Sequence, residues 1–425
     1  MRTFFLHLFV FAFIFSTISC SEDTKKEVID QFEVAKSTKS RETDPSVSTA
    51  QMDELVTGNT SFALDLYSTV KETEEGNFFY SPFSISLALA MTYAGAEGTT
   101  ETQMADTMEF TLPEPELHSA FNALDLDLQS RGTGDASQFR LNIANAIWGQ
   151  TGYHFEQSFL DTIALNYGSG LNLLDFMADP EACRTIINDW VEEKTEDRIQ
   201  DLLPEGSIGS DTRMVITNAI YFWGEWVEMF SRDMTAAGSF HKDDGTDVSV
   251  DFMHIEASYN YVEGTGYEAI ELPYKGDDTS MVIIAPDAGT LAQFEATLDA
   301  TLLAGIIASL SPTGMLFSMP KFEFEHRLDV KALLMEMGME APFDGAVADF
   351  SGLNGGHDLV ITDILHKAFV AVNEDGTEAA AATAVVVGET SVPANIVDID
   401  RPFIFLIRDK VTGTILFIGR IADPS

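Results

Sequence analysis

Few residues of this 425-residue chain have the types and spacing that covalent catalysis requires. The sequence contains no Gly-x-Ser-x-Gly turn, no His-Glu-x-x-His helix and no Gly-x-x-x-x-Gly-Lys phosphate loop, and its eight histidines are scattered. Residues 371–382 come closest to a calcium loop, but alanines stand at the first and twelfth positions, where acidic residues are needed. We therefore expect no catalytic residue, no metal site and no cofactor, and an enzyme is the weaker functional class.

One stretch, residues 363–403, has a composition that no ordinary surface loop requires. Residues 364–373 alternate between apolar and mixed side chains, as a buried strand does. The alternation ends before Gly376, which brings backbone freedom that no other residue has. Beyond it no charged residue lies between Glu378 and Glu389, and alanine and valine dominate.

Residues 377–387 are open to two interpretations. On local propensity Thr377 caps a helix that begins with four alanines, since alanine is the best helix former. The β-branched Thr383 and residues 385–387 oppose a continued helix because they are stiff at the first side-chain torsion. At period two, one face holds only small or β-branched side chains, which suits a strand that enters a narrow slot: Thr377, Ala379, Ala381, Thr383, Val385 and Val387. The segment can therefore be a loop or a strand.

Two motifs in this stretch resemble those of the serpin family. Glu374-Asp375-Gly376-Thr377-Glu378, followed by Ala379, Ala380, Ala381 and Ala382, resembles the hinge of the family's reactive loop. Asp400-Arg401-Pro402-Phe403-Ile404-Phe405 resembles the signature beyond that loop, at nearly the family's spacing. The resemblance implies an α+β single domain with a large central β-sheet, smaller sheets or a barrel, about eight or nine helices and an exposed reactive loop near residues 376–398.

The resemblance also implies a function, the suicide inhibition of a serine protease. In that mechanism the protease attacks a bait bond as it attacks any substrate, and the cut loop then inserts into the main sheet and distorts the bound enzyme. By the family's spacing from Gly376 the bait bond is Thr390-Ser391, which suits elastase-like or subtilisin-like pockets rather than trypsin-like ones. Cleavage after Glu389 would instead indicate a glutamate-specific protease.

A non-inhibitory surface protein of the same fold, which binds or interacts with other molecules, is the alternative from another class. Non-inhibitory relatives often carry bulky, charged or proline residues in the hinge, whereas this chain carries Thr377 and alanines. The hinge composition therefore favours the inhibitor.

The resemblance assigns roles to residues outside the loop as well. Four polar residues correspond to a cluster beneath the point where the central strands part: Ser81, Ser84, Asn218 and His366. A closed set of buried hydrogen bonds can hold two strands together until a third arrives, although His366 could also be an ordinary satisfied core histidine. Three residues correspond to the top of the slot, with a salt bridge between the lysine and the glutamate: Trp226, Lys321 and Glu374.

The N-terminal residues read as a targeting segment and a tether. Residues 1–19 contain an apolar core too short to span a bilayer, as in a signal peptide. Cys20 ends a motif, Thr-Ile-Ser-Cys, that resembles a bacterial lipobox, so we expect a lipid anchor at an outer membrane or cell surface; a soluble periplasmic or extracellular protein stays open. Residues 20–50 read as a flexible tether and residues 51–425 as the domain. With Cys20 lipidated, Cys183 is the only remaining thiol and no intrachain disulfide can form.

The formal net charge of −44 restricts the partners. Nucleic acid, heparin and an anionic membrane face all need clustered cations, so none of them is expected to bind. The predicted helix at residues 114–131 corresponds to the one that binds glycosaminoglycans in some serpins, yet Arg131 is its only cation. We expect a monomer whose partner is the target serine protease, held as a covalent acyl complex.

Periodicity indicates the remaining elements. Helical spacing predicts helices over residues 52–70, 82–94, 114–131, 155–166, 180–196 and 330–337. Apolar runs and alternation predict strands over residues 139–148, 171–176, 214–223, 248–262, 267–273, 280–285, 319–322, 403–408 and 414–420.

Overall fold

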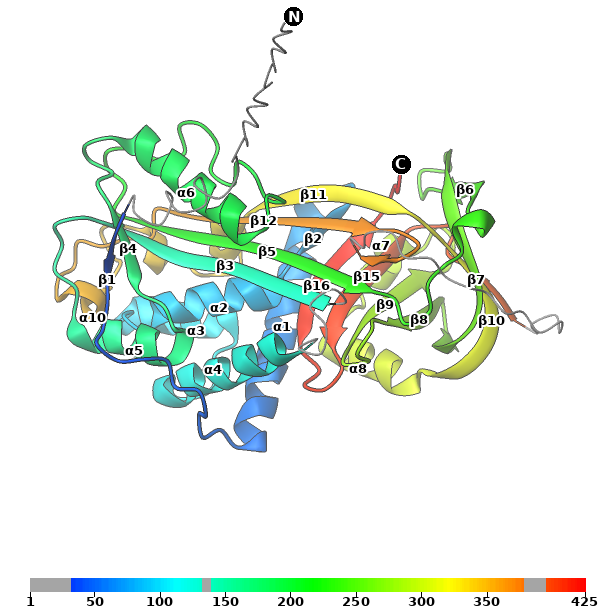
Figure 1. Cartoon of the computed structure of the whole chain (residues 1–425), viewed down its shortest axis with the longest axis horizontal. Helices are drawn as coiled ribbons and strands as arrows, with labels where there is room; N and C mark the ends of the chain where they lie inside the picture. Colours follow the sequence, from blue (N-terminus) through cyan, green and yellow to red (C-terminus); the bar gives the residue numbers. More distant parts are fainter. Residues whose placement is uncertain (1–31, 132–138, 378–394) are drawn as a thin grey trace, which may run out of the picture.

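The structure, a computed structural model, describes residues 32–131, 139–377 and 395–425. It contains two β-sheets flanked by helices, so the α+β class expected from the sequence is confirmed (Figure 1). Several predicted functional residues lie outside the described residues: Cys20, Glu378, Ala379, Ala380, Ala381, Ala382, Glu389, Thr390 and Ser391.

The described residues form ten α-helices, rather than the eight or nine that the resemblance implies: α1 (Thr49–Thr73), α2 (Pro82–Tyr93), α3 (Gly98–Met108), α4 (Glu114–Ser130), α5 (Gln157–Tyr167), α6 (Pro180–Lys194), α7 (Leu291–Glu295), α8 (Ala300–Ser309), α9 (Val330–Glu336) and α10 (Ser351–Asn354). The shortest are α7, with five residues, and α10, with four. Two 3₁₀ turns, η2 (Arg232–Met234) and η3 (Ala341–Phe343), are also present.

The seven-stranded sheet is the main sheet. Its strand order is β1 (Glu33–Ala35), β4 (Leu171–Leu174), β3 (Phe139–Gln150), β5 (Met214–Glu225), β13 (Gly376–Thr377), β12 (Asp363–Val372) and β11 (Phe322–Asp329). We call the end where Thr377 pairs with Gly224 the hinge end. The opposite end, where Met214 pairs with Gly149, is the far end. Gly224 lies ten positions after Met214 along β5, or roughly 33 Å at the usual rise of a strand.

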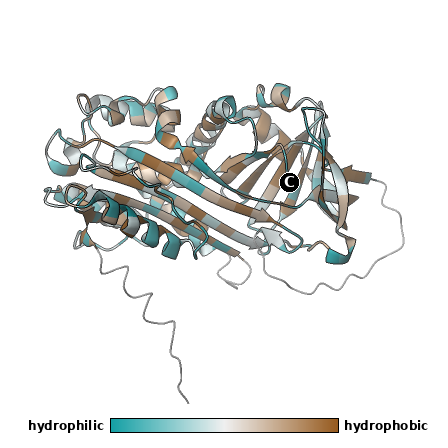
Figure 2. Cartoon of the chain, turned by 90° about the horizontal axis from the view of Figure 1, so that it is seen from above, coloured by the Kyte–Doolittle hydropathy of each residue, from teal (hydrophilic) through white to brown (hydrophobic). Residues whose placement is uncertain are grey.

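The second sheet has nine strands and is open, so it is neither smaller in strand number than the main sheet nor a closed barrel. Its order is β14 (Asn395–Asp398), β10 (Ser311–Pro320), β7 (Asp247–Gly264), β8 (Tyr267–Pro273), β9 (Thr279–Pro286), β15 (Phe403–Asp409), β16 (Ile415–Ile421) and β2 (Phe78–Tyr80), with β6 (Ala236–His241) on the other side of β7. Figure 2 shows apolar residues concentrated along its strands, in agreement with the complete burial of β9 and β16.

The single strand predicted at residues 319–322 is wrong. β10 ends at Pro320 in the nine-stranded sheet, and β11 begins at Phe322 in the main sheet. Lys321 lies at the junction and donates its backbone N–H to Asp251 O at 2.9 Å. The chain passes from one sheet to the other at this residue with no glycine to mark the change.

Helices cover both faces of the main sheet. α6 lies across one face and buries Ile187 and Val191 against Ala144 and Trp148 of β3 (Figure 1). On the other face α2 packs against β3 and β5, and its twelve residues are all buried. Ser81 caps its first turn by accepting the N–H of Ser84, and proline at the first helical position fits the cap.

The flexible tether expected over residues 20–50 does not extend that far. We call residues 32–48 the N-terminal strap: β1 pairs with β4 at the edge of the main sheet, and Phe32 packs edge-to-face on Trp148 with 5.0 Å between ring centroids. The strap then runs over α4 and α5, where Lys39 pairs with Asp161 at 2.9 Å and Arg41 with Asp125 at 2.6 Å. These long-range contacts fix polar residues that have no apolar periodicity of their own. Within the three described ranges, no helix is long and apolar enough to cross a bilayer.

Candidate strand-insertion site

The two central strands of the main sheet are paired at the far end and parted at the hinge end. β5 and β12 run parallel and pair directly up to Ile220 and Ala368. Farther along, β13 lies between them, with Thr377 antiparallel to Gly224 on one side and to Val372 on the other. Gly376 and Thr377 of the hinge thus occupy the mouth of a fork, and toward the far end the fork is closed by the direct pairing of β5 with β12.

Thr377 is seated in a closed pocket at this mouth. Its side chain is 1% exposed, and its hydroxyl lies 2.7 Å from the Tyr274 hydroxyl. The Tyr274 ring stacks on Trp226 with 4.6 Å between centroids, and Trp226 Nε1–H donates to Asn373 O at 3.0 Å. Trp226 therefore holds the residue before the hinge and the ring that receives the hinge.

Only glycine fits at position 376, because the backbone of β5 lies against its Cα. A Cβ built on it would lie 2.1 Å from the carbonyl oxygen of Gly224, which belongs to the backbone of β5 and cannot move aside as a side chain can. Any other residue would push β13 out of the fork. The turn before it is held as well, because the backbone N–H groups of Trp226 and Phe230 each donate at 2.9 Å to the carbonyls of Asp375 and Glu374.

The top-of-slot salt bridge is formed by a buried carboxylate. Glu374 is 5% exposed and pairs with Lys321 Nζ at 3.1 Å, and Thr235 Oγ1 donates to it at 2.7 Å. Burial alone would raise the pKa of Glu374, but the hydrogen bonds from Thr235 and Lys321 outweigh it and the pKa is lowered. The neighbouring Asp375, also buried, pairs with Arg232. Both acids of the hinge are thereby anchored to the domain.

The polar cluster lies lower in the fork, where β5 and β12 are paired. Asn218 and His366 are direct register partners, and His366 Nδ1 contacts Asn218 Oδ1 in a short hydrogen bond. His366 Nε2 accepts the backbone N–H of Ser81 at 3.1 Å. Asn218 Nδ2 donates to Ser84 Oγ at 2.8 Å. All four predicted residues are fully buried and belong to one network that joins the two strands to the start of α2.

The network also contains Asn145 of β3, which was not predicted. Asn145 Oδ1 accepts from Asn218 Nδ2 at 2.7 Å and from Ser84 Oγ at 3.1 Å. Its own Nδ2 donates to Ser84 O at 2.9 Å. The available signal was a polar residue between Ala144 and Ala146, since a partly buried amide also needs hydrogen-bond partners and Asn145 is in register with Asn218.

The two ring nitrogens of His366 have opposite roles. Nε2 must be unprotonated because it accepts a backbone N–H, and Nδ1 must carry the proton because its partner is an amide oxygen. Burial lowers the pKa of His366 to about 3, with a further lowering from His326. The cluster is therefore built around a neutral imidazole.

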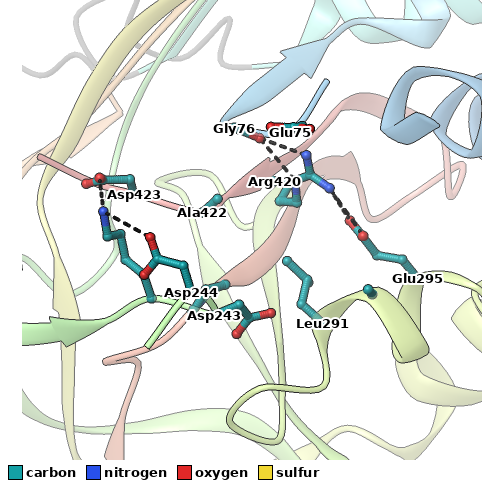
Figure 3. Close-up of a pocket in the computed structure, with 12 residues that line it drawn as sticks. Glu75, Gly76, Asp243, Asp244, Leu291, Glu295, Arg420, Ala422 and Asp423 are labelled. Atoms are coloured by element: carbon teal, nitrogen blue, oxygen red, sulfur yellow. Dashed lines mark hydrogen bonds and ion pairs between the residues drawn. The ribbon is translucent and has the colours of Figure 1, made fainter. Parts of the chain in front are cut away.

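One described pocket lies away from the fork and contains no catalytic group. This pocket, shown in Figure 3, measures about 350 Å³ and is lined by acidic, basic and apolar residues without His, Cys, Ser or Thr. Each of its two cations is paired with an acid: Arg420 Nη1 lies 3.2 Å from both carboxylate oxygens of Glu295, and Lys242 lies 3.2 Å from Asp423. The lining also contains Glu75, Asp243 and Asp244. Within the described ranges no group of three or more His, Cys, Asp or Glu side chains is arranged to hold a metal ion.

Comparison with known proteins agrees with this arrangement. A family model described as "Serpin (serine protease inhibitor)" matches residues 57–424. The chain belongs to the serpin family. An uncharacterised serpin-like protein of Methanosarcina acetivorans is 38% identical over 374 residues, which cover 87% of this chain and 86% of that protein.

Two human proteins are also similar to this chain. A leukocyte elastase inhibitor is 37% identical over 387 residues, or 88% of this chain and 100% of that protein. The crystal structure of thyroxine-binding globulin superposes with a TM-score of 0.80 at 29% identity, covering 88% of this chain and 100% of that one. The strap before residue 49 precedes the segment that the family model matches.

The neutral state of His366 makes strand parting sensitive to acid. Because its pKa is lower in the folded protein than in the unfolded chain, the unfolded chain takes up the proton first and stability falls with falling pH. We expect this loss to begin near pH 6.5, the ordinary value, and to continue toward about pH 3. Denaturant midpoints measured from about pH 7 to about pH 4.5 should fall more steeply for wild type than for His366→Gln, which does not titrate.

His154→Gln is the matched control, because His154 is exposed. Its midpoints should follow those of wild type across the series. If wild type and His366→Gln lose stability in parallel, the neutral histidine has no role in holding the strands.

Proposed function

We propose that this serpin is a suicide-substrate inhibitor of elastase-like or subtilisin-like serine proteases. The observation that carries the proposal is the hinge, because Gly376 and Thr377 already lie between two strands that are otherwise paired to each other. A loop that starts inside the fork can continue down it once its other end is cut free. Every second residue after Thr377, from Ala379 to Val387, is small or β-branched, and these residues would face the same side of a strand as Thr377.

Insertion would exchange one set of strand pairings for two. The direct parallel pairing of β5 and β12 would be replaced by an antiparallel ladder on each side of the inserted strand, and each added backbone hydrogen bond contributes about 0.5–1.5 kcal/mol net. Burial of Val385 and Val387 would contribute roughly 1.5–3 kcal/mol each. These gains drive the loop into the sheet with the acylated protease attached, before water can release the enzyme.

We assign the bait bond to Thr390-Ser391. A small β-branched residue suits a shallow apolar pocket, and the similarity to leukocyte elastase inhibitors supports a target of that class. Recognition of Glu389 by a glutamate-specific protease is the second possibility for the same loop. The target's own serine and histidine perform the chemistry, so the serpin needs no catalytic group.

A binding protein with the serpin fold is the alternative function. The similarity to thyroxine-binding globulin, a protein crystallised with its ligand, favours it, and the pocket in Figure 3 would be the place to look for a ligand. Against it, the hinge of this chain is seated in the fork and has no bulky residue. The two functions differ in whether a protease is trapped covalently.

Mixing the protein with an elastase-like or subtilisin-like protease should give a complex that survives boiling in detergent, with the released fragment beginning at Ser391. Thr377→Arg should give cleaved serpin and free protease instead, because a charged side chain has no partner in the pocket beside Tyr274. Gel electrophoresis with mass spectrometry of the fragment distinguishes these products.

Thr377→Ser is the control, since it keeps the hydroxyl that meets Tyr274, and it should trap the protease as wild type does. A fragment that begins at Thr390 would move the recognised residue to Glu389. Wild type that is cut without forming any complex would refute inhibition and favour the binding protein.

We also propose that Cys20 carries a lipid anchor and that the bait loop faces away from the membrane. Phe32 lies only twelve positions after Cys20 and precedes β1 at the far end of the main sheet, where Glu33 pairs with Leu173. A chain of that length reaches at most about 43 Å when fully extended, and roughly 20 Å as a random coil. The anchor and the hinge would then lie at opposite ends of the domain.

Replacing the lipid-bearing cysteine should release the protein from membranes. Cys20→Ala should move it to the soluble fraction on cell fractionation, whereas Cys183→Ala should remain with the membranes, because Cys183 lies on the buried face of α6. If the two variants partition identically, Cys20 bears no anchor.

A further inference from the structure

The N-terminal strap joins two parts of the domain that strand insertion would move relative to each other. At its first end β1 pairs with β4, and Phe32 packs on Trp148 of β3. Beyond β1 the strap lies on α5 and α4, where Lys39 and Arg41 form ion pairs. The strap precedes the segment that the family model matches, so its contacts are additional to those within that segment.

Insertion of a strand would move four strands together. A strand placed between β5 and β12 increases their separation by one strand spacing, about 4.8 Å. β3 pairs with β5 over eleven register positions, β4 pairs with β3 over three, and β1 pairs with β4 over three. We call β1, β4, β3 and β5 the moving half-sheet. Because backbone hydrogen bonds join these strands, β1 is carried along when β5 separates from β12.

The α4 end of the strap is connected to β12. Arg41 Nε donates to Asn122 Oδ1 at 2.8 Å, and its Nη2 pairs with Asp125 at 2.6 Å. Asn122 Nδ2 donates in return to Glu42 O at 2.8 Å. Both α4 side chains are buried, and α4 packs against α1, α1 against α9, and α9 against β12. Helices therefore link this end of the strap to the strand from which the moving half-sheet must separate.

The sheet end of the strap contacts a residue that is bonded to β5. Phe32 lies edge-on to Trp148, with 5.0 Å between ring centroids, and Trp190 of α6 lies 5.4 Å from the same ring. Trp148 is fully buried, and its Nε1–H donates to Thr217 Oγ1 of β5 at 3.0 Å. Thr217 precedes Asn218, the β5 member of the polar cluster. Phe32 thus packs on a ring that moves with β5.

The strap has little slack between these two ends. Only five residues, 36–40, lie between β1 and Arg41. Two of the five are held on α5, because Ser37 Oγ donates to Asp161 at 2.5 Å and Lys39 pairs with the same carboxylate at 2.9 Å. A relative shift of about 4.8 Å would therefore break the contacts at one end, since a hydrogen bond is lost beyond about 3.5 Å.

From these contacts we propose that the N-terminal strap restrains the opening of the fork by joining the moving half-sheet to α4. The proposal rests on the proposed inhibitory function and concerns the rate of its insertion step. Contacts that must break before the strands part raise the barrier to insertion. The strap thereby prolongs the lifetime of the form whose loop has not entered the sheet.

Three variants of the full chain test the restraint. Phe32→Ala removes the ring contact at the sheet end, Arg41→Ala removes the contacts at the α4 end, and the third variant carries both substitutions. The loop is cut rapidly by an excess of a subtilisin-like protease. Insertion is then followed by pulsed hydrogen exchange, as new protection of backbone amides in β5 and β12.

Two further variants are controls. Phe32→Tyr keeps the ring that packs on Trp148. Tyr267→Ala removes a half-buried ring that lies 5.5 Å from Phe294, outside the main sheet and the strap. Both should insert the loop within about twofold of the wild-type rate, because neither releases the strap.

Each single substitution in the strap should raise the rate constant of insertion about three- to tenfold, because either one releases the restraint. The double variant should insert no faster than the faster single variant. A link that is broken at one end transmits nothing through the other, so the two effects should not multiply as those of independent sites do.

Unchanged rates in both single variants, effects that multiply in the double variant, or an equal acceleration in Tyr267→Ala would overturn the restraint and leave insertion intact. Absence of new protection in cut wild type would overturn insertion itself, and with it the inhibitory function and the restraint. Wild type alone therefore distinguishes the two failures.

Discussion

The direct pairing of β5 with β12 is the constraint on which the rest of the structure depends. Two neighbouring parallel strands pair over six register positions and then part, and a two-residue strand lies in the opening. Parallel pairing is slightly weaker per residue than antiparallel pairing, and a strand inserted between them would be antiparallel to both. The sheet is therefore held in an arrangement that one more strand would improve.

Two buried polar networks hold this arrangement, an upper one at the hinge end and a lower one farther toward the far end. The lower network joins the strands through Asn218 and His366, and separation of the strands leaves buried amide and imidazole groups without partners, which is costly. The upper network holds the hinge through Glu374 and Thr377 without closing the fork. The lower network therefore opposes separation of β5 from β12, whereas the upper network keeps the first residues of the inserting strand between them. This division explains how a loop can wait beside a sheet that would accept it.

Residue periodicity and turn-forming residues predicted those features of the site that depend on neighbouring residues in the sequence. The side-chain period of a strand placed Thr377 on an inward face, and the serine-proline pair predicted the start of α2. The resemblance to the serpin family, rather than local pattern, assigned Ser81 to the polar cluster. Contacts between segments that are distant in the sequence could not be predicted from periodicity or turn-forming residues. Asn145 joins the network only through its register with Asn218, and Lys321 divides two strands of different sheets with no glycine to mark the change. The N-terminal strap was taken for a tether because its polar residues are fixed by partners more than eighty positions away, such as Asp125 and Asp161.

The central claim is that the intact protein is less stable than the form with the loop inserted, and thermal melting of intact and loop-cleaved protein tests it most directly. Cleavage frees one end of the loop, so the account predicts that the cleaved protein melts well above the intact protein, with new protection of backbone amides along β5 and β12 in hydrogen exchange. Equal melting temperatures, with β5 and β12 exchanging as before, would contradict the account whatever family the chain belongs to.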